Sequence, residues 1–367
     1  MHGRPAPQRH RGRGTGRPVR AVAGRHRGPS RLRSPGRGEV GVNTPHVAAL
    51  GGGTGLSSLL RGLKRRDLNV SAIVGVADDG GSSGRLRREL GMLPPGDIRN
   101  VLVALADDES LMGRLFQHRF ADGDLSGHPF GNLILAALTE VTGSFDEAVR
   151  EASRVLKVNG RVIPGALEHV RLWAEREDGS EACGETLIAS GVGACRRVWL
   201  DPEPAAHPDA LAAISDADLI LLGPGSVFTS VLPHLAVGDI AEAVAQSRGL
   251  RAYVCNIMTQ PGETDGMDAL AHLDRVLEMA PDAVDVVVVH AGALEPAALT
   301  QYAAQGQEPV LVDVPALESR GVRVVAADIA EDDHAVRHSP EALADVLMPL
   351  AREGADRRAA SGSAHPA

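Results

Sequence analysis

Short apolar stretches alternate with amphipathic ones along most of this chain. The apolar stretches each run into a polar or glycine-rich turn and predict buried strands at 46–50, 70–77, 218–222, 251–256 and 284–290. The amphipathic stretches predict helices at 55–66, 97–107, 132–141, 145–156, 239–248 and 268–279. Buried strands that alternate with helices are typical of a parallel sheet covered on both faces. We therefore expect an α/β fold built on a Rossmann-like, doubly wound, mainly parallel sheet.

Residues 161–200 interrupt this alternation. Apolar runs are short there and are separated by turn residues such as Asp178 and Gly179, which predicts a small inserted antiparallel β element. We expect a single Rossmann-like α/β domain over residues 45–354 that carries this element, followed by a disordered tail over residues 355–367.

Residues 1–44 differ from the rest in composition. The first 40 residues hold eleven Arg and one acid, interleaved with Gly and Pro, and have no apolar periodicity. Such a segment cannot bury enough apolar surface to offset its ordering entropy, so we expect it to be disordered. Two interpretations remain: an arm able to bind nucleic acid, or a mis-called translation start, with the true start near Val40 or Val42.

The charge of the remaining chain narrows the function. Without the first 40 residues it has 27 basic and 46 acidic residues, a net charge of −19. Nucleic-acid binding needs clustered Lys and Arg, so this acidity argues against it and favours a small-molecule binder. Cys183, Cys195 and Cys255 form neither a disulfide framework nor a C-x-x-C metal motif, which indicates a reducing compartment.

No apolar run approaches the ~18 residues needed to span a bilayer. We therefore expect a cytoplasmic protein with no membrane span. A homo-oligomer is possible, and the sequence does not identify which protein partners it has.

The turn after the first predicted strand carries the strongest chemical signal. Four of the residues 51–55 are glycine, which leaves the backbone open to a ligand, and the N–H groups of the following helix favour phosphate. Asp78 follows Gly51 by 27 residues, near the distance at which dinucleotide-binding units place a ribose-binding carboxylate. The candidate ligand-binding residues here are Gly52, Gly53, Thr54, Gly55, Asp78, Asp79, Gly80, Gly81, Ser82, Ser83, Gly84 and Arg85.

Two later strand ends carry similar turns. Ligands of open α/β sheets bind at the carboxyl ends of strands. The turn after 251–256 is also longer and more polar than a plain connection requires. The candidates from these two turns are Gly223, Gly225, Ser226, Asn256, Thr259, Gln260 and Glu263.

Two predicted helix starts add further polar candidates. Asp97 is either an ordinary N-cap or a ligand contact. Arg99 and Asn100 follow it in the first turn, where a cation is disfavoured unless an anion is present. His128 is a proton donor, a phosphate contact or a turn residue, and Asn132 is a cap or a ligand contact.

These motifs resemble the gluconeogenesis factor family, which is related to 2-phospho-L-lactate transferase. The resemblance runs in order over about residues 45–350 and is carried by Gly51–Leu56, Ala77–Leu86, Pro95–Asn100, Phe116–Phe120, His128–Asn132, Gly223–Ser226 and Asn256–Asp265. It implies a Rossmann-like fold that binds a nucleotide-sugar, UDP-N-acetylglucosamine, and a role in central carbon metabolism, cell-wall synthesis and cell shape. Because no reaction is established for the family, we expect a non-catalytic regulator and assign no catalytic residue.

The related transferase is the alternative. It implies a nucleotide-linked phospho-donor and Mg²⁺, which Asp78 and Asp79 could hold through oxygen ligands. Ribose binding and turn capping are the competing interpretation of these two residues. The intact runs at 78–85 and 258–265 favour the gluconeogenesis factors. Met267 stands where relatives commonly carry an aromatic residue, so base stacking is weaker here if that aromatic holds the base.

The residues then divide by expected role. The turns at 52–55 and 223–226 hold phosphates, and Asp78 or Asp79 holds ribose hydroxyls. Arg85 and Arg99 offset the charge of the ligand. The remaining polar groups of the ligand are oriented by Asn100, His128, Asn132, Asn256 and Thr259.

Overall fold

The computed structural model describes residues 44–106, 110–331 and 336–362. The arm predicted at the N-terminus therefore lies outside the described residues up to residue 43, and so does the predicted tail from residue 363 onward.

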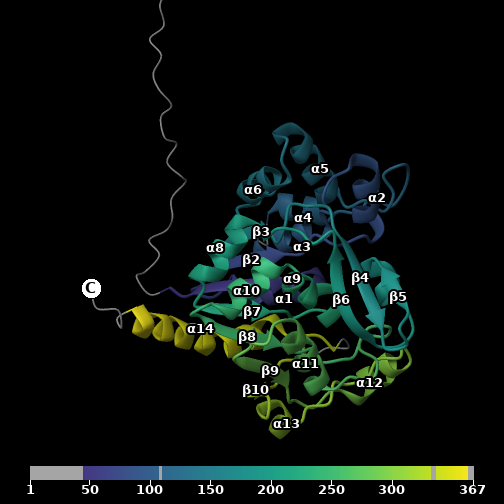
Figure 1. Ribbon diagram of the computed structural model, residues 1–367. Helices are drawn as coiled ribbons and strands as arrows, with labels where there is room; N and C mark the ends of the chain where they lie inside the picture. Colours follow the sequence, from purple (N-terminus) through teal and green to yellow (C-terminus); the bar gives the residue numbers. More distant parts are fainter. Residues whose placement is uncertain (1–43, 107–109, 332–335, 363–367) are drawn as a thin grey trace, which may run out of the picture. The chain divides into compact units, whose positions relative to one another are not determined.

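Seven parallel strands form the central sheet of the described residues, in the order β10-β9-β8-β7-β1-β2-β3 (Figure 1). They are β1 (His46–Gly51), β2 (Asn69–Val74), β3 (Arg161–Pro164), β7 (Leu219–Leu222), β8 (Leu250–Val254), β9 (Val286–His290) and β10 (Arg323–Ala327). Their Val, Ile, Leu and Ala side chains are largely buried, as a sheet covered on both faces requires. This arrangement confirms the predicted fold class and the five predicted strands; β3 and β10 were not predicted.

The winding of the chain reverses at the middle of this sheet. From β1 it proceeds through β2 to β3, returns to β7 beside β1, and continues through β8 and β9 to β10. Because such crossovers are right-handed, the reversal puts the connecting helices on opposite faces. The crevice at the carboxyl ends of β1 and β7 is where ligands of doubly wound sheets bind.

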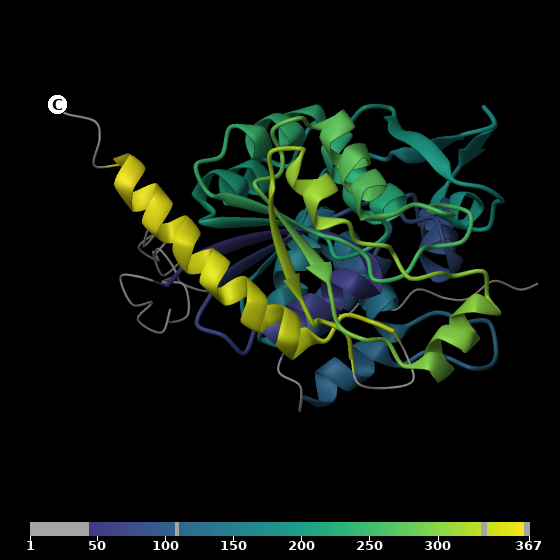
Figure 2. The ribbon, with the colours of Figure 1, turned by 90° about the horizontal axis from the view of Figure 1, so that it is seen from below.

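The helices accordingly form two layers. Helix α1 (Gly53–Leu63) packs against α3 (Gly96–Leu105) and α14 (Pro340–Gly362). Figure 2 shows α14 in yellow and α1 in purple on one face of the sheet, with the green helices of residues 208–279 on the other. Taken singly, none of the helices in the described ranges is long and apolar enough to cross a membrane.

The remaining helical segments connect these elements. They are α2 (Gly81–Leu90), α4 (Leu111–Gln117), α5 (Phe130–Thr142), α6 (Phe145–Leu156), α7 (Glu185–Ala189), α8 (Pro208–Asp216), the π-helical η1 (Val227–Val231), α9 (Leu232–Leu235), α10 (Gly238–Ala245), α11 (Ala269–Met279), α12 (Pro296–Ala303) and α13 (Val314–Glu318). Helix α2 was not predicted, and its first turn takes up much of the expected ligand-binding run at 80–85.

The inserted antiparallel element is a second sheet with the order β5-β4-β6, made of β4 (Arg171–Arg176), β5 (Glu181–Cys183) and β6 (Cys195–Asp201). Trp173 pairs with Trp199 across β4 and β6, and the two rings stack with centroids 6.0 Å apart. The predicted start at residue 161 was too early. Residues 161–164 form β3, which pairs in parallel with β2 in the main sheet.

The prediction of a disordered tail from residue 355 is wrong as far as residue 362, because α14 continues to Gly362. Apolar side chains in the first half of α14, including Leu347, are buried in the core. Farther along, Arg357 donates to Asp285 at 3.1 Å, and Arg358 donates to two backbone carbonyls at 2.9 Å each. These contacts with distant segments stabilise the last turns, and no local pattern reveals them.

Candidate functional site

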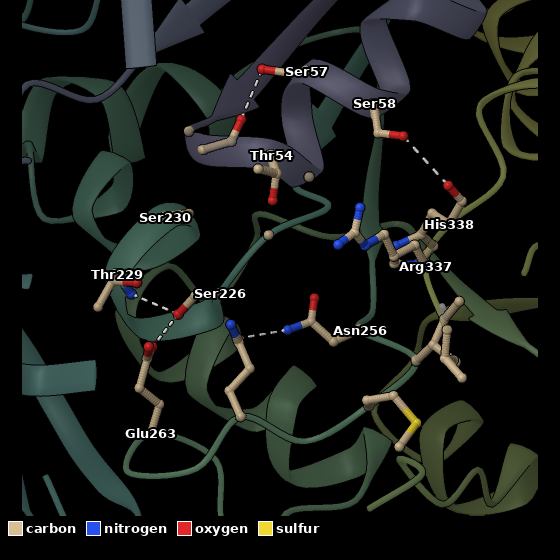
Figure 3. Close-up of a pocket in the computed structure, with 18 of the residues that line it drawn as sticks. Thr54, Ser57, Ser58, Ser226, Thr229, Ser230, Asn256, Glu263, Arg337 and His338 are labelled. Atoms are coloured by element: carbon tan, nitrogen blue, oxygen red, sulfur yellow. Dashed lines mark hydrogen bonds between the residues drawn. The ribbon is translucent and has the colours of Figure 1, made fainter. Parts of the chain in front are cut away.

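A pocket of about 660 Å³ lies at the reversal point of the sheet. The turns after β1, β7 and β8 line it together with α7 and the segment that precedes α14 (Figure 3). This volume suits a small-molecule ligand. The predicted candidates that line the pocket are Gly52, Gly53, Thr54, Gly55, Asn100, Gly225, Ser226, Asn256, Thr259, Gln260 and Glu263.

Gly52, Gly53 and Gly55, which follow β1, differ in what a side chain at each position would meet. Gly53 has a φ of +61°, and a Cβ there would meet nothing within 4 Å. At Gly52 a Cβ would overlap the carboxylate of Asp97, and at Gly55 it would lie 2.6 Å from the carbonyl oxygen of Pro224. Gly53 is thus the position where the backbone faces open space, as a phosphate site requires.

The turn after β7 is held by its own side chains. Ser226 Oγ accepts a hydrogen bond from the Thr229 amide at 3.0 Å and donates to Glu263 Oε2 (Figure 3). Both Ser226 and Glu263 are buried. Burial raises the pKa of the Glu263 carboxyl, and the hydrogen bonds from Ser226 and Thr229 oppose that rise. The turn after β7 is therefore held by a hydrogen-bonded network of its own side chains, whereas the turn after β1 leaves its backbone open.

The loop after β8 is stabilised by internal hydrogen bonds. Asn256 Nδ2 donates to Gln260 Oε1 at 3.1 Å, and the Gln260 amide donates to Thr264 Oγ1 at 2.8 Å. Met267, at the end of this loop, belongs to the buried core and is not among the residues that line the pocket. An effect of Met267 on base stacking therefore stays a prediction. Among its described lining residues the pocket does contain an aromatic, Tyr302.

One wall of the pocket is acidic. Glu185 and Glu263 line it, and Asp97 lies directly behind Gly52. Burial raises the pKa of Glu185 to about 8, with further contributions from the nearby Asp97, Asp78 and other carboxylates. In the described part of the chain, no three His, Cys, Asp or Glu side chains are grouped so that they could hold a metal ion.

The arginines among the described lining residues of the pocket are Arg61 and Arg337, and neither was predicted from the sequence. Figure 3 shows Arg337 across the pocket from Glu263. Among residues 44–106, 110–331 and 336–362, neither guanidinium has a hydrogen-bond or ion-pair partner. The predicted cations are engaged elsewhere: Arg85 donates to the carbonyl of Ser126 at 2.8 Å, and Arg99 donates to Asn100 Oδ1 at 2.6 Å.

A local signal existed for one of the two missed arginines. Arg61 follows Thr54 and Ser58 at helical spacing, which places all three on one face of α1. Arg337 lies in the segment before α14, far from every glycine-rich turn in the sequence, and nothing in its local sequence marks it as a site residue.

The other predicted candidates are outside the pocket lining, as far as the described residues define it. They are Asp78, Asp79, Gly80, Gly81, Ser82, Ser83, Gly84, Arg85, Asp97, Arg99, His128, Asn132 and Gly223. Asp78 Oδ1 accepts from the Gly80 amide at 2.8 Å, and Asp79 Oδ1 accepts from the amide and hydroxyl of Thr186 at 3.1 Å each. Asp78 thus bonds within its own turn and Asp79 bonds to α7, and their binding of ribose stays a prediction.

Three of these candidates form a buried network of their own. Ser82 Oγ lies 2.8 Å from His128 Nδ1 and accepts from Asn132 Nδ2 at 3.0 Å. Burial lowers the pKa of His128, and the nearby Arg85 lowers it further. The structure thus brings these residues to one another rather than to the open glycine turn.

The fold is that of a Rossmann-like α/β protein with a pocket where its sheet reverses. The family model for 2-phospho-L-lactate transferase CofD matches residues 47–330. The gluconeogenesis factor of Bacillus subtilis is 45% identical over 313 residues, covering 84% of this chain and 99% of that protein.

A gluconeogenesis factor of Halalkalibacterium halodurans is 44% identical over 320 residues, covering 86% of this chain and 98% of that protein. A solved structure of a upf0052 family member from Bacillus halodurans superposes with a TM-score of 0.81 at 44% identity, over 84% of this chain and 100% of that chain. The chain therefore belongs to the 2-phospho-L-lactate transferase CofD family and groups within it with the gluconeogenesis factors.

Proposed function

We propose that this protein is a regulator that binds a nucleotide-sugar of the UDP-N-acetylglucosamine type in the pocket at the carboxyl ends of β1, β7 and β8. The observation that carries the proposal is the combination of an open glycine position, Gly53, with two unpaired guanidinium groups, Arg61 and Arg337, among the described residues that line one pocket. Helix N-termini and arginine are the usual protein partners of phosphate groups.

The pocket offers a partner for each part of such a ligand. The Gly53 backbone and the two arginines suit the diphosphate, and Tyr302 offers an aromatic ring for a base. Asn100, Asn256 and Gln260 supply amide groups for the hydroxyls and the acetamido group of a sugar. With its pKa near 8, Glu185 is largely protonated at neutral pH and can donate a hydrogen bond.

The regulatory role rests on the family resemblance. Relatives are named gluconeogenesis factors. We place the protein in the cytoplasm, where a nucleotide-sugar level would inform it about the supply of carbon to cell-wall synthesis and so affect cell shape. The bound ligand is expected to stay intact.

A transferase that acts on a nucleotide-linked phospho-donor is the second candidate, because the family model bears the name of 2-phospho-L-lactate transferase. Magnesium between Asp78 and Asp79 is not supported, since Asp79 accepts two hydrogen bonds from Thr186 and Asp78 accepts one from Gly80. Release of product from a nucleotide donor in the presence of Mg²⁺ and an acceptor, abolished by Asp78→Asn, would favour the transferase.

The test is isothermal titration of the purified protein with UDP-N-acetylglucosamine, followed by mass spectrometry of the recovered ligand. Arg61→Gln and Arg337→Gln should each weaken binding by about 10- to 100-fold, because each removes a charge-assisted hydrogen bond. Arg65→Gln is the matched control, since Arg65 pairs with Glu341 at the surface and does not line the pocket. Equal affinity in all three variants would contradict the proposed site.

A further inference from the structure

An acid of the protein itself already lies at the N-terminus of α1. The Asp97 carboxylate lies near the Gly53 amide, which lowers the pKa of that carboxyl. A Cβ at Gly52 would overlap Asp97 Oδ2, so the carboxylate lies directly against the turn. Helix α1 has no acid in its own first turn, and Gly52 provides no side-chain cap. Asp97, which belongs to α3, therefore gives α1 the negative charge that a helix N-terminus favours.

This is the same place that the proposed function gives to a ligand phosphate. The backbone at Gly53 is open on its pocket side, and Gly52 and Gly53 both line the pocket. A phosphate that approaches this turn meets the N–H groups of α1, and the Asp97 carboxylate lies directly behind Gly52. Two anions in contact repel each other strongly wherever water is largely excluded.

Three other charged residues surround Asp97, each from a different segment or position of the chain. Asp78 lies in the loop after β2, Arg99 lies one half-turn along α3, and Glu185 lies on α7. Burial and the repulsion from Asp78 raise the pKa of Asp97 to about 6, and the Gly53 amide and Arg99 oppose that rise. Both protonation states of Asp97 are therefore accessible near neutral pH.

We infer that the Asp97 carboxylate supplies a negative charge directly beside the phosphate position at the N-terminus of α1 when no ligand is bound, and that ligand binding is coupled to the uptake of one proton by this carboxylate. The inference rests on the proposed function and adds its regulation. The proton comes from solvent and stays on Asp97, and no covalent bond to the ligand forms or breaks. The protein would then bind its ligand more tightly at lower pH.

The sign of the pH dependence follows from the position of the pKa. Asp97 is mostly protonated below pH 6 and ionised above it. If only the protonated form admits the phosphate, the apparent affinity is highest below pH 6 and falls by up to about tenfold for each pH unit above it.

The experiment is titration calorimetry with UDP-N-acetylglucosamine from pH 5.5 to 8, because both phosphates of this probe stay fully ionised over that range. The unaltered protein should lose affinity as the pH rises. In two buffers of different ionisation enthalpy at pH 7, its binding heat should show the uptake of about one proton. Asp97→Asn keeps the shape of the side chain and removes its charge, so it should bind with little pH dependence and more tightly than the unaltered protein at pH 8.

Two neighbouring variants separate Asp97 from its surroundings. Asp78→Asn removes a repelling charge, so the pKa of Asp97 should fall and the loss of affinity should begin at a lower pH. Glu185→Gln removes a second carboxyl of this wall, whose pKa is raised to about 8, and should leave the fall near pH 6 in place.

The outcomes distinguish this inference from the proposed function. A folded Asp97→Asn protein with the pH profile of the unaltered protein would overturn the inference alone, and so would binding without proton uptake by the unaltered protein. Loss of binding in Asp97→Asn at every pH would instead make Asp97 a direct ligand contact. No binding by the unaltered protein at any pH would contradict the proposed function, and this inference with it.

Discussion

The turns after β1 and β7 look alike in sequence but differ in the structure. Both are glycine-rich, both follow a buried strand, and both precede a helical segment. After β1, Gly53 faces open space and its helix has no capping side chain of its own. After β7, Ser226 caps η1 and bonds to the buried Glu263, and Gly225 lies against Ser230.

The difference separates two uses of glycine. Where a turn carries a hydroxyl that can cap the next helix, its N–H groups are satisfied internally and the glycines allow close packing. Where the turn has no such group, the N–H groups remain for a ligand or for a distant residue such as Asp97. The two turns should therefore respond differently to substitution: one in binding, the other in stability.

The largest expected effect is on binding, in Gly53→Val. The side chain would fill the open position, and loss of the phosphate contact should weaken UDP-N-acetylglucosamine binding by about 10- to 100-fold. Gly91→Val is the matched control, because Gly91 has a φ of +62° and also faces open space, but it lies outside the pocket lining. Both variants should lose similar stability. Equal affinity of Gly53→Val and Gly91→Val in titration calorimetry would contradict a phosphate contact at Gly53.

Gly225→Val tests the turn after β7. Gly225 has a φ of +154°, and a Cβ would lie 3.1 Å from the Cβ of Ser230. The free energy of unfolding should fall by about 1–3 kcal/mol from backbone strain and crowding. Urea unfolding measures this change in the free energy of unfolding. Gly143→Val is the control, because Gly143 has a φ of +73° but a Cβ there would meet nothing within 4 Å. A stable Gly225→Val protein that no longer binds would place the ligand at this turn instead.

Ser226→Ala should have a smaller effect on stability that depends on pH. Loss of the cap costs about 1 kcal/mol. The substitution also removes a hydrogen bond that lowers the pKa of Glu263. The pKa of Glu263 in the folded protein therefore rises further above its value in the unfolded chain. A raised acid pKa costs stability above the unfolded pKa and none below it, so the deficit should be larger at pH 8 than at pH 4. Urea unfolding of both proteins at pH 4 and pH 8 measures this deficit in stability. In the Glu263→Gln background, Ser226→Ala should cost the same stability at both pH values.

The smallest expected effect is that of Arg85→Gln on ligand binding. Arg85 donates to the Ser126 carbonyl and does not line the pocket, so the affinity should change by less than about twofold. Thermal shift with the nucleotide-sugar is sufficient to measure this. A tenfold loss would show that the ligand extends toward the network of Ser82, His128 and Asn132.

Part of the site was predictable because it is local in sequence. Ligands bind at the carboxyl ends of parallel strands, so the turns that contain Gly53, Ser226 and Asn256 could be found from the strands that precede them. The candidates at Asp97, His128 and Asn132 were recognised as polar helix starts, but their partners were not predicted. His128 bonds to Ser82, which is 46 residues away in the chain.

The sequence by itself determined the fold class and the positions of the three turns, because the periodicity of apolar residues and the placement of glycine are local properties. Only the tertiary structure decided which turn is open, that Arg61 and Arg337 supply the cations, and that the end of α14 is ordered. These features depend on contacts between segments far apart in the chain. Asp97 shows the reason: its sequence marks a helix start, but its position against Gly52 arises only when α1 and α3 pack together.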